Sequence, residues 1–299
     1  MKPHSLVSLF SRKSVFCRAA CVGALLLIAS SLQAQNLFVS EGTYIYKFTP
    51  GGTFSYFATG LSISSGLASD SAGNIFVAET GSGNIYEFTP GGVRSTFASG
   101  LSTPGSLAFN SAGNLFVANE GGGNILEYNS SGVQSTFASG LSSPLALAFD
   151  RAGNLFEADG SGNIYEFTPG GVRSTFVSSF GGFTGLAFNS AGDLFGSSDS
   201  GPIDEFSPDG TVSEFASPSS VTTGLAFNSN GNLFALDGNS FIDEYTPGGM
   251  KSTFFGPGVT GQALAFQGEI LPVPEPSALG LLAVGAIALL VRRRRKLVA

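Results

Sequence analysis

Six carboxylates offer the most direct chemistry in this sequence, because they recur at a regular spacing. Each stands at or just past the end of a short apolar run that opens with Asn-Leu-Phe or a close variant. The six are Glu41, Glu79, Glu120, Asp159, Asp199 and Asp237. If these runs are equivalent strands of a closed ring, the carboxylates lie on one face around its axis, and such oxygen ligands suit Ca²⁺ or Mg²⁺. An acid at this place also commonly caps a Gly-rich turn, so an ion site and a capping role both stay open.

Glu157 is a seventh candidate because it breaks a pattern. It occupies the strand position that Val39, Val77, Val117 and Ala235 hold elsewhere in the chain. A carboxylate among apolar equivalents is a local inconsistency of the kind found at functional sites. The alternative is an edge position from which the side chain reaches solvent. We therefore group Glu157 with the six carboxylates as a candidate ligand-binding or metal-binding residue.

The rare residues exclude several kinds of site. The single His and both Cys (His4, Cys17 and Cys21) stand within the first 21 residues. The body of the chain therefore has no Ser-His-Asp or Cys-His catalytic system, no Cys/His zinc site and no disulfide. The whole chain has a net charge of −7, but residues 35–270 hold 20 acidic and five basic side chains, a balance of −15. No P-loop or dinucleotide motif occurs, and a nucleic-acid partner is not expected for so acidic a body.

The elements that must position these acids belong to six copies of one unit. The copies begin at Asn36, Asn74, Asn114, Asn154, Asp193 and Asn232, with spacings of 38, 40, 40, 39 and 39 residues. Each copy contains four short apolar runs bounded by Gly, Pro and Asn, which indicate antiparallel strands in a meander. In the second copy these runs are 75–78, 85–89, 93–98 and 106–110. Four strands in about 40 residues fit one blade of a β-propeller.

The aromatic residues support this architecture, because 21 of the 28 Phe fall at equivalent places in these strands. Rings at one register fill the layer between neighbouring blades. The fourth run, Gly-Leu-Ala-Phe or close to it, suits the innermost strand. The last run, 263–267, is then expected to complete the first blade and close the ring. The predicted fold class is an all-β, six-bladed propeller of four-stranded antiparallel blades over residues 35–270, with an N-terminal signal helix and a C-terminal hydrophobic helix.

The connection between the second and third strands has its own signature. Thr-Pro-Gly-Gly places Pro second and Gly third, which predicts a type II turn. Cross-strand ion pairs are expected on either side of this turn. They would join Glu87 to Arg94, Glu166 to Arg173 and Glu244 to Lys251.

The N-terminus carries an export signal. Residues 1–34 combine four basic residues, the apolar run 19–29 and an Ala-ended exit, which predict a secretory signal peptide cleaved after Ala34. A permanent anchor is the alternative, but a run of about 11 apolar residues is short of the ~20 that span a bilayer.

The C-terminus, residues 271–299, has three consecutive parts. The triplet Pro274, Glu275 and Pro276 precedes the apolar segment 278–291, a transmembrane candidate that would give roughly 21 Å of helix. A basic cluster follows and places the extreme end in the cytoplasm. It consists of Arg292, Arg293, Arg294, Arg295 and Lys296.

This order of motif, apolar segment and cations over residues 273–296 resembles the PEP-CTERM sorting signal, also described as an ice-binding-protein C-terminal domain. The resemblance implies a Gram-negative-type bacterium and recognition by an exosortase, a membrane transpeptidase. It also implies transient anchoring in the inner membrane, cleavage near Pro274-Glu275-Pro276 and delivery to the cell surface or extracellular matrix. An ordinary C-terminal anchor behind a Pro-rich linker is the alternative.

The strand pattern of residues 36–267, with its NLFVAD-like openings, resembles NHL-repeat propellers and the gluconolactonase and virginiamycin B lyase propellers. The lyases depend on histidine, which this body lacks. Gluconolactonase-like enzymes hold a divalent metal with Glu, Asn and Asp, which Glu41-Gly42 and Asp237-Gly238-Asn239 echo. The Glu-Gly-Pro and nearby Trp expected of those enzymes are absent, so their site does not transfer.

These observations predict an exported binding or structural module. Its expected partners are a polysaccharide or a surface protein, and Ca²⁺ or Mg²⁺ is the candidate ion. The alternative is a metal-dependent lactonase or hydrolase that uses the acidic ring. A purely structural propeller without a specific ligand is the third interpretation.

Overall fold

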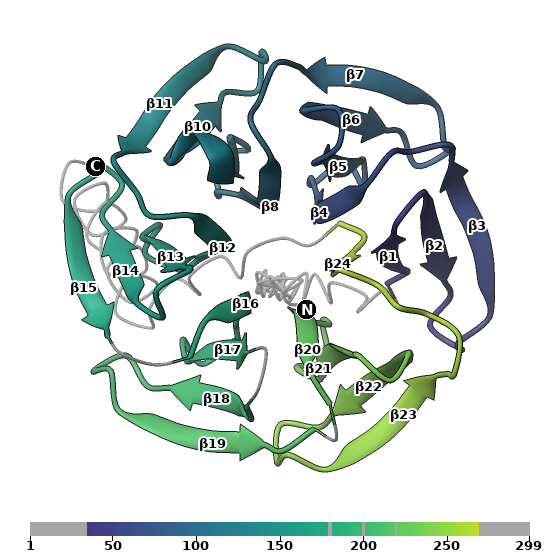
Figure 1. The fold of residues 1–299 in the computed structure, drawn as a ribbon. Helices are drawn as coiled ribbons and strands as arrows, with labels where there is room; N and C mark the ends of the chain where they lie inside the picture. Colours follow the sequence, from purple (N-terminus) through teal and green to yellow (C-terminus); the bar gives the residue numbers. More distant parts are fainter. Residues whose placement is uncertain (1–34, 179–180, 199–200, 219, 269–299) are drawn as a thin grey trace, which may run out of the picture. The chain divides into compact units, whose positions relative to one another are not determined.

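The computed structural model describes residues 35–178, 181–198, 201–218 and 220–268. These residues form twenty-four strands in six four-stranded antiparallel sheets, which surround a common axis as the blades of a propeller (Figure 1). The predicted fold class is thus confirmed for the body. The predicted signal helix and the C-terminal hydrophobic helix, with its span 278–291, lie outside the described residues. Within the described ranges, no helix has the length and apolar character needed to cross a membrane.

Each blade begins with an inner strand at the axis and ends with an outer strand at the rim. From inside to outside, blade 1 consists of β24 (Ala263–Phe266), β1 (Leu37–Glu41), β2 (Tyr44–Phe48) and β3 (Phe54–Thr59). Blade 2 consists of β4 (Ser64–Ser69), β5 (Ile75–Glu79), β6 (Asn84–Phe88) and β7 (Arg94–Ala98). Blade 3 consists of β8 (Pro104–Phe109), β9 (Leu115–Asn119), β10 (Asn124–Tyr128) and β11 (Gln134–Ser139).

The second half of the ring repeats this order. Blade 4 consists of β12 (Pro144–Phe149), β13 (Leu155–Asp159), β14 (Ile164–Phe167) and β15 (Arg173–Val177). Blade 5 consists of β16 (Phe183–Phe188), β17 (Leu194–Ser198), β18 (Ile203–Phe206) and β19 (Val212–Ala216). Blade 6 consists of β20 (Thr222–Phe227), β21 (Leu233–Asp237), β22 (Phe241–Tyr245) and β23 (Lys251–Phe255).

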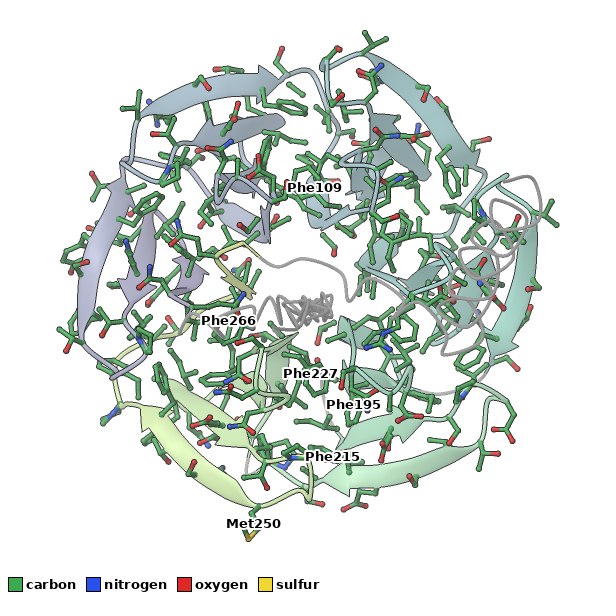
Figure 2. All side chains as sticks on the ribbon, turned by 180° about the vertical axis from the view of Figure 1, so that it is seen from behind. Phe109, Phe195, Phe215, Phe227, Met250 and Phe266 are labelled. Carbon is green, nitrogen blue, oxygen red and sulfur yellow. The ribbon has the colours of Figure 1, made fainter. Side chains whose placement is uncertain are left out.

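Phenylalanine triads bind each blade to the next. In Figure 2, Phe195 and Phe215 of blade 5 lie beside Phe227 of blade 6, with ring centroids 4.9 and 5.0 Å from that of Phe195 in near-perpendicular pairs. Such pairs contribute about 0.5–1.5 kcal/mol each beyond the area they bury. Four further seams repeat the triad, and at the seam between blades 1 and 2 Ser69 replaces the third ring. The inter-blade layer is therefore an aromatic core.

The first and last described strands close the ring. β24 pairs with β1 in antiparallel register from Leu37–Phe266 to Ser40–Ala263, so blade 1 contains both ends of the propeller. Gln267 extends the seam, because its side-chain Oε1 accepts the Asn36 side-chain amide at 2.8 Å and its backbone N–H donates to the Asn36 carbonyl. This pairing covers the edge of β1 that would otherwise be unpaired and gives blade 1 its fourth strand.

The turn between the second and third strands differs from the prediction. In Thr89-Pro90-Gly91-Gly92 the positive φ falls at Gly92 (83°), not at Gly91, where a type II turn requires it. A left-handed residue at the last turn position inserts a bulge-like extra residue into the hairpin. The type II assignment is therefore wrong, and the strand register moves by one residue.

The predicted ion pairs across this turn are also wrong for the same reason. Glu87, Glu166 and Glu244 lie opposite serines. The cations instead lie over neighbouring groups on the second strand. The Arg94 guanidinium is 4.9 Å from the Tyr86 ring centroid, and Arg173 is 4.8 Å from that of Tyr165. In blade 6, Lys251 Nζ is 2.7 Å from the buried Asp243 carboxylate.

Close approach of the inner strands explains the small residues in the fourth run. A Cβ placed on Gly66 of β4 would lie 2.1 Å from the Gly105 carbonyl oxygen of β8, which is inside van der Waals contact. A Cβ on Gly105 would meet no atom closer than 3.8 Å. Packing therefore requires glycine at position 66, whereas position 105 has room for a larger side chain.

We predict that Gly66→Ala destabilises the protein by about 1–3 kcal/mol, because the methyl group must displace backbone of the next blade. The matched change Gly105→Ala should be neutral or stabilise by about 0.4–1 kcal/mol through the unfolded state. Thermal unfolding of both variants beside the unchanged protein measures this difference. Equal melting temperatures for the two variants would contradict the close approach.

Candidate functional site

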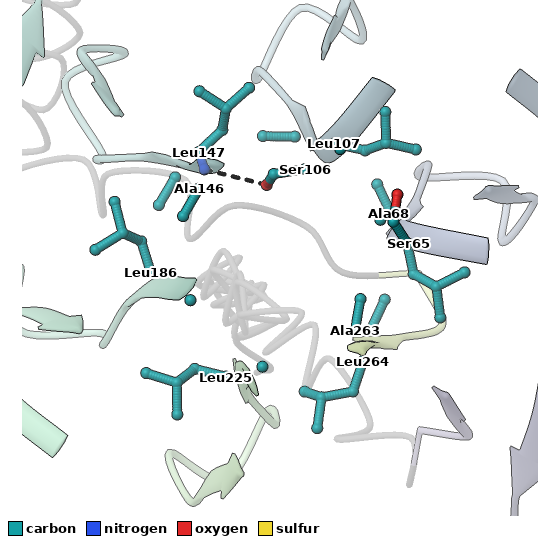
Figure 3. A pocket seen from close by; sticks show the side chains of 18 of the residues that line it. Ser65, Ala68, Ser106, Leu107, Ala146, Leu147, Leu186, Leu225, Ala263 and Leu264 are labelled. Carbon is teal, nitrogen blue, oxygen red and sulfur yellow. Dashed lines mark hydrogen bonds between the residues drawn. The ribbon is translucent and has the colours of Figure 1, made fainter. Parts of the chain in front are cut away.

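The inner strands of all six blades enclose a cavity of about 580 Å³ on the propeller axis (Figure 3). A ring of leucines and a ring of alanines, supplied by the inner strands, make most of its wall. The leucines are Leu67, Leu107, Leu147, Leu186, Leu225 and Leu264. Among the described residues, Glu120 is the one charged side chain in the lining. The cavity wall is thus apolar and offers little acid–base chemistry.

The hydroxyl groups of this wall are used to join neighbouring blades. Ser65 Oγ donates to the Pro104 carbonyl at 3.0 Å, and Thr223 Oγ1 donates to the Gly261 carbonyl at 2.9 Å. The Ser106 hydroxyl accepts the Leu147 backbone N–H at 3.1 Å, as Figure 3 shows. These bonds connect strands that share no backbone ladder. They are therefore structural links between blades.

Glu79, Asp159 and Asp237 lie buried at strand ends, and Glu79 and Asp159 bind groups of the adjoining loops. Glu79 Oε1 accepts the Ser62 backbone N–H, and its Oε2 accepts the Ser82 hydroxyl. Asp159 Oδ1 accepts the backbone N–H groups of Ser161 and Asn163, each at 2.9 Å. Both side chains cap the turn after their strand, which is the structural alternative to an ion site.

Glu41 and Asp237 also make loop contacts. Glu41 Oε1 accepts the Thr260 hydroxyl at 2.6 Å, and Asp237 Oδ1 accepts the Asn239 backbone N–H at 2.7 Å. Asp237 thus fixes the Asp-Gly-Asn segment that echoes a lactonase metal site.

Blades 3 and 5 depart from the ring pattern. The strand-end residue of blade 3 is Asn119, whose Oδ1 accepts the Ser102 backbone N–H at 2.8 Å. Glu120 comes one residue later, in the 3-10 turn η1 (Glu120–Gly122), where its Oε1 accepts the Ser143 hydroxyl at 2.8 Å. In blade 5 the strand ends at Ser198, and Asp199 lies outside the described residues.

The described carboxylates are spread around the ring and do not converge. Over residues 35–268, apart from 179–180, 199–200 and 219, no group of three His, Cys, Asp or Glu side chains is close enough to hold a metal ion. Each of the five described members of the predicted ring accepts a local hydrogen bond through a carboxylate oxygen instead. The Ca²⁺ or Mg²⁺ site stays a prediction.

Glu157 is the most unusual ionisable group in the described structure. It is 0 % exposed, and neither carboxylate oxygen has a hydrogen-bond partner. On β13 it shares a face with Leu155, which belongs to the apolar layer between blades 3 and 4, and it lies directly opposite Leu147 and Tyr165. Glu157 does not reach solvent.

The surroundings of Glu157 disfavour its charged form. The pKa of Glu157 is raised from 4.5 to about 8, mainly by burial and also by the nearby Asp159 carboxylate, whereas Arg173 on β15 lowers it. The folded protein therefore holds a proton that the unfolded chain loses in the same pH range. The edge position reaching solvent, the alternative from the sequence, is therefore wrong, and a ligand-binding or metal-binding role of Glu157 stays a prediction.

Sequence reasoning missed an aromatic cluster on blade 1. Tyr44 and Tyr46 on β2 and Phe54 and Tyr56 on β3 share one face of the hairpin. The signal was present as alternate aromatic residues on both sides of one turn. It was hidden by the general abundance of aromatic residues in the repeats.

A family comparison identifies the end of the chain. Residues 272–295 carry a PEP-CTERM protein-sorting motif. The match includes the predicted triplet Pro274, Glu275 and Pro276 and the arginine cluster. The motif indicates export, recognition by an exosortase and transient membrane anchoring during sorting. A search of curated proteins finds no significant match to the sequence.

Solved structures resemble the propeller at low sequence identity. A gluconolactonase from Xanthomonas campestris matches with a TM-score of 0.63 at 16 % identity, covering 78 % of this chain and 83 % of that one. Virginiamycin B lyase from Staphylococcus aureus matches with a TM-score of 0.56 at 16 % identity, covering 67 % and 73 %. A protein of unknown function from Bacteroides caccae matches with a TM-score of 0.63 at 16 % identity, covering 79 % of this chain and 100 % of that one. These similarities show the fold alone.

We predict that Glu157 makes stability depend on pH. Because the pKa of the folded state is raised, the folded protein binds the extra proton between pH 4.5 and about 8, and stability falls as the pH rises through this range. The full slope is about 1.4 kcal/mol per pH unit. Glu157→Gln should remove this slope. The free energy of unfolding of the variant, compared with that of the unchanged protein, should therefore be more favourable at pH 8 than at pH 5.

Urea unfolding at pH 5 and pH 8 measures this gain. Glu166→Gln on the neighbouring strand β14 is the matched control, because that residue is only half-buried, and its pH dependence should equal that of the unchanged protein. If the free energy of unfolding differs between pH 5 and pH 8 by the same amount in Glu157→Gln and in the unchanged protein, Glu157 is not the source of the pH dependence.

Proposed function

We propose that this chain is an exported propeller that acts as a binding module at the cell surface or in the extracellular matrix. The observation that carries the proposal is the order of the parts: a PEP-CTERM motif at residues 272–295 follows a ring closed by β24. The motif supplies sorting by an exosortase and release near Pro274-Glu275-Pro276. The ring supplies a rigid body that presents side chains at its surface.

Two features of the ring favour binding over catalysis. The body has neither His nor Cys, and the five described ring carboxylates are engaged in capping turns or in contacts between loops. The hydroxyl groups of the axial cavity likewise connect blades. The third strands of the blades, on the outside of the ring, also present exposed side chains, which suits attachment to a polymer or to another surface molecule. A polysaccharide is the partner we favour.

Sorting is tested by changing Pro274, Glu275 and Pro276 together to Ala in the full chain. We expect the altered chain to stay in the membrane fraction with its tail uncleaved, because the exosortase no longer recognises it. The unchanged chain in a host without exosortase should behave in the same way and serves as the control. Equal release of both chains in a normal host would refute processing at this motif.

Polysaccharide binding is tested with the processed protein recovered from exporting cells. In affinity electrophoresis, we expect the host's own exopolysaccharide, added to the gel, to slow its migration in a concentration-dependent way. Bovine serum albumin in the same gel controls for sieving. Unchanged mobility in every envelope polysaccharide of the host would overturn the binding proposal.

A further inference from the structure

Blade 1 carries an exposed aromatic surface, the tyrosine face, made of Tyr44, Tyr46, Phe54 and Tyr56. Tyr44 is 42 % exposed, Phe54 46 % and Tyr56 60 %, whereas Tyr46 is nearly buried between them. Tyr46 lies directly opposite Tyr56 across the hairpin. The four rings form one continuous surface, because neighbouring centroids are 5.2–5.9 Å apart.

The other five blades do not have this surface. In the same hairpin position as Tyr56, they carry Thr96, Thr136, Thr175, Glu214 and Thr253. In the position of Phe54, they carry Arg94, Gln134, Arg173, Val212 and Lys251. Blade 1 therefore replaces polar or smaller side chains with aromatic rings at two equivalent positions at once.

Buried aromatic residues hold the tyrosine face in place. Phe54 packs on Phe255 of blade 6 with centroids 5.1 Å apart, and Phe255 packs on Phe48 at 4.9 Å. Tyr46 is fixed by burial among the other rings, and burial, the nearby Glu41 carboxylate and the neighbouring Tyr56 raise its pKa to about 12. The rings thus stand on two paired strands, which position a binding surface better than loops do.

Packing alone does not account for the outer rings. Tyr44, Phe54 and Tyr56 leave around half of their surfaces in water, although they pack on one another, on Tyr46 and on Phe255. Grouped aromatic residues on a protein surface usually mark a contact site. Tyrosine suits such a site because its ring is apolar and its hydroxyl bonds polar groups.

The size and charge of the surface limit the choice of partner. The three exposed rings offer roughly 300 Å² at ~200 Å² per aromatic side chain, which is far below the ~800 Å² that each partner contributes to a stable protein interface. The face itself has no charged group. At the position of Phe54, three other blades carry a cation, which is Arg94, Arg173 or Lys251. Glu41 and the acidic body repel anionic polymers.

We propose that the tyrosine face binds an uncharged polysaccharide. Its rings stack on the apolar C–H faces of successive sugars, and the hydroxyls of Tyr44 and Tyr56 exchange hydrogen bonds with sugar hydroxyls. A narrow strip suits a polymer, because a chain of sugars gains strength from repeated weak contacts. This inference rests on the proposed surface or matrix function and assigns the site that performs it.

The test uses the processed protein and its double variant Tyr44→Ala/Tyr56→Ala in affinity electrophoresis. The gels contain the host's exopolysaccharide, the neutral polymers hydroxyethyl cellulose, xylan and galactomannan, or anionic alginate. We expect the unchanged protein to bind the exopolysaccharide and at least one neutral polymer, and the double variant to bind them at least tenfold more weakly. Tyr56→Trp should retain binding, because it keeps an aromatic surface.

Thr96→Ala, at the equivalent position of blade 2, is the matched control and should bind like the unchanged protein. Melting temperatures check that the double variant stays folded, because each ring pair that it loses lowers stability by about 0.5–1.5 kcal/mol. Undiminished exopolysaccharide binding by the folded double variant would overturn the site while leaving the proposed function intact. Absence of binding by the unchanged protein would overturn both. Preference for alginate, or a tyrosine-dependent dimer in sedimentation, would also overturn the inference.

Discussion

Closure of the ring is the constraint on which the rest of the structure depends. Each blade is a small sheet with one thick aromatic layer on either side, and it is stable only between two neighbours. The pairing of β24 with β1 supplies the last neighbour and turns a row of repeats into a ring. Loss of that pairing would open the seam between blades 6 and 1 and expose the aromatic faces of both blades. Repetition of the Phe triad at five of the six described seams is consistent with this constraint, since a poor seam weakens the whole ring.

Closure also decides which polar groups remain available. On the inside, hydroxyls such as those of Ser65 and Thr223 replace the backbone hydrogen bonds that neighbouring blades do not share. At the strand ends, Glu79 and Asp159 hold the turns that carry the chain outwards. The parts of a propeller that most resemble an active site thus make structural contacts in this protein.

The periodic features could be predicted from the sequence, whereas the features that depend on single residues could not. The spacing of the copies and the recurrence of Phe give the blades, their order and the inner position of the Gly-Leu-Ala-Phe run, because packing repeats with the sequence. The register across the turn was missed, since Gly92 and not Gly91 takes the left-handed conformation. The burial of Glu157 was not predictable, because the same alternation places a side chain either in a seam or at a solvent-facing edge.

The strand that closes the ring is also the one that leads to the sorting tail. Any tension on the C-terminal end, for example from drag on an anchored cell-surface molecule, enters the propeller at β24 and acts first on its ladder with β1. In the surface attachment proposed above, the resistance of the propeller to such tension is set by this four-residue strand and the Gln267–Asn36 contacts beside it. Pulling on this end would separate β24 from β1 and open the ring before any other blade unfolds.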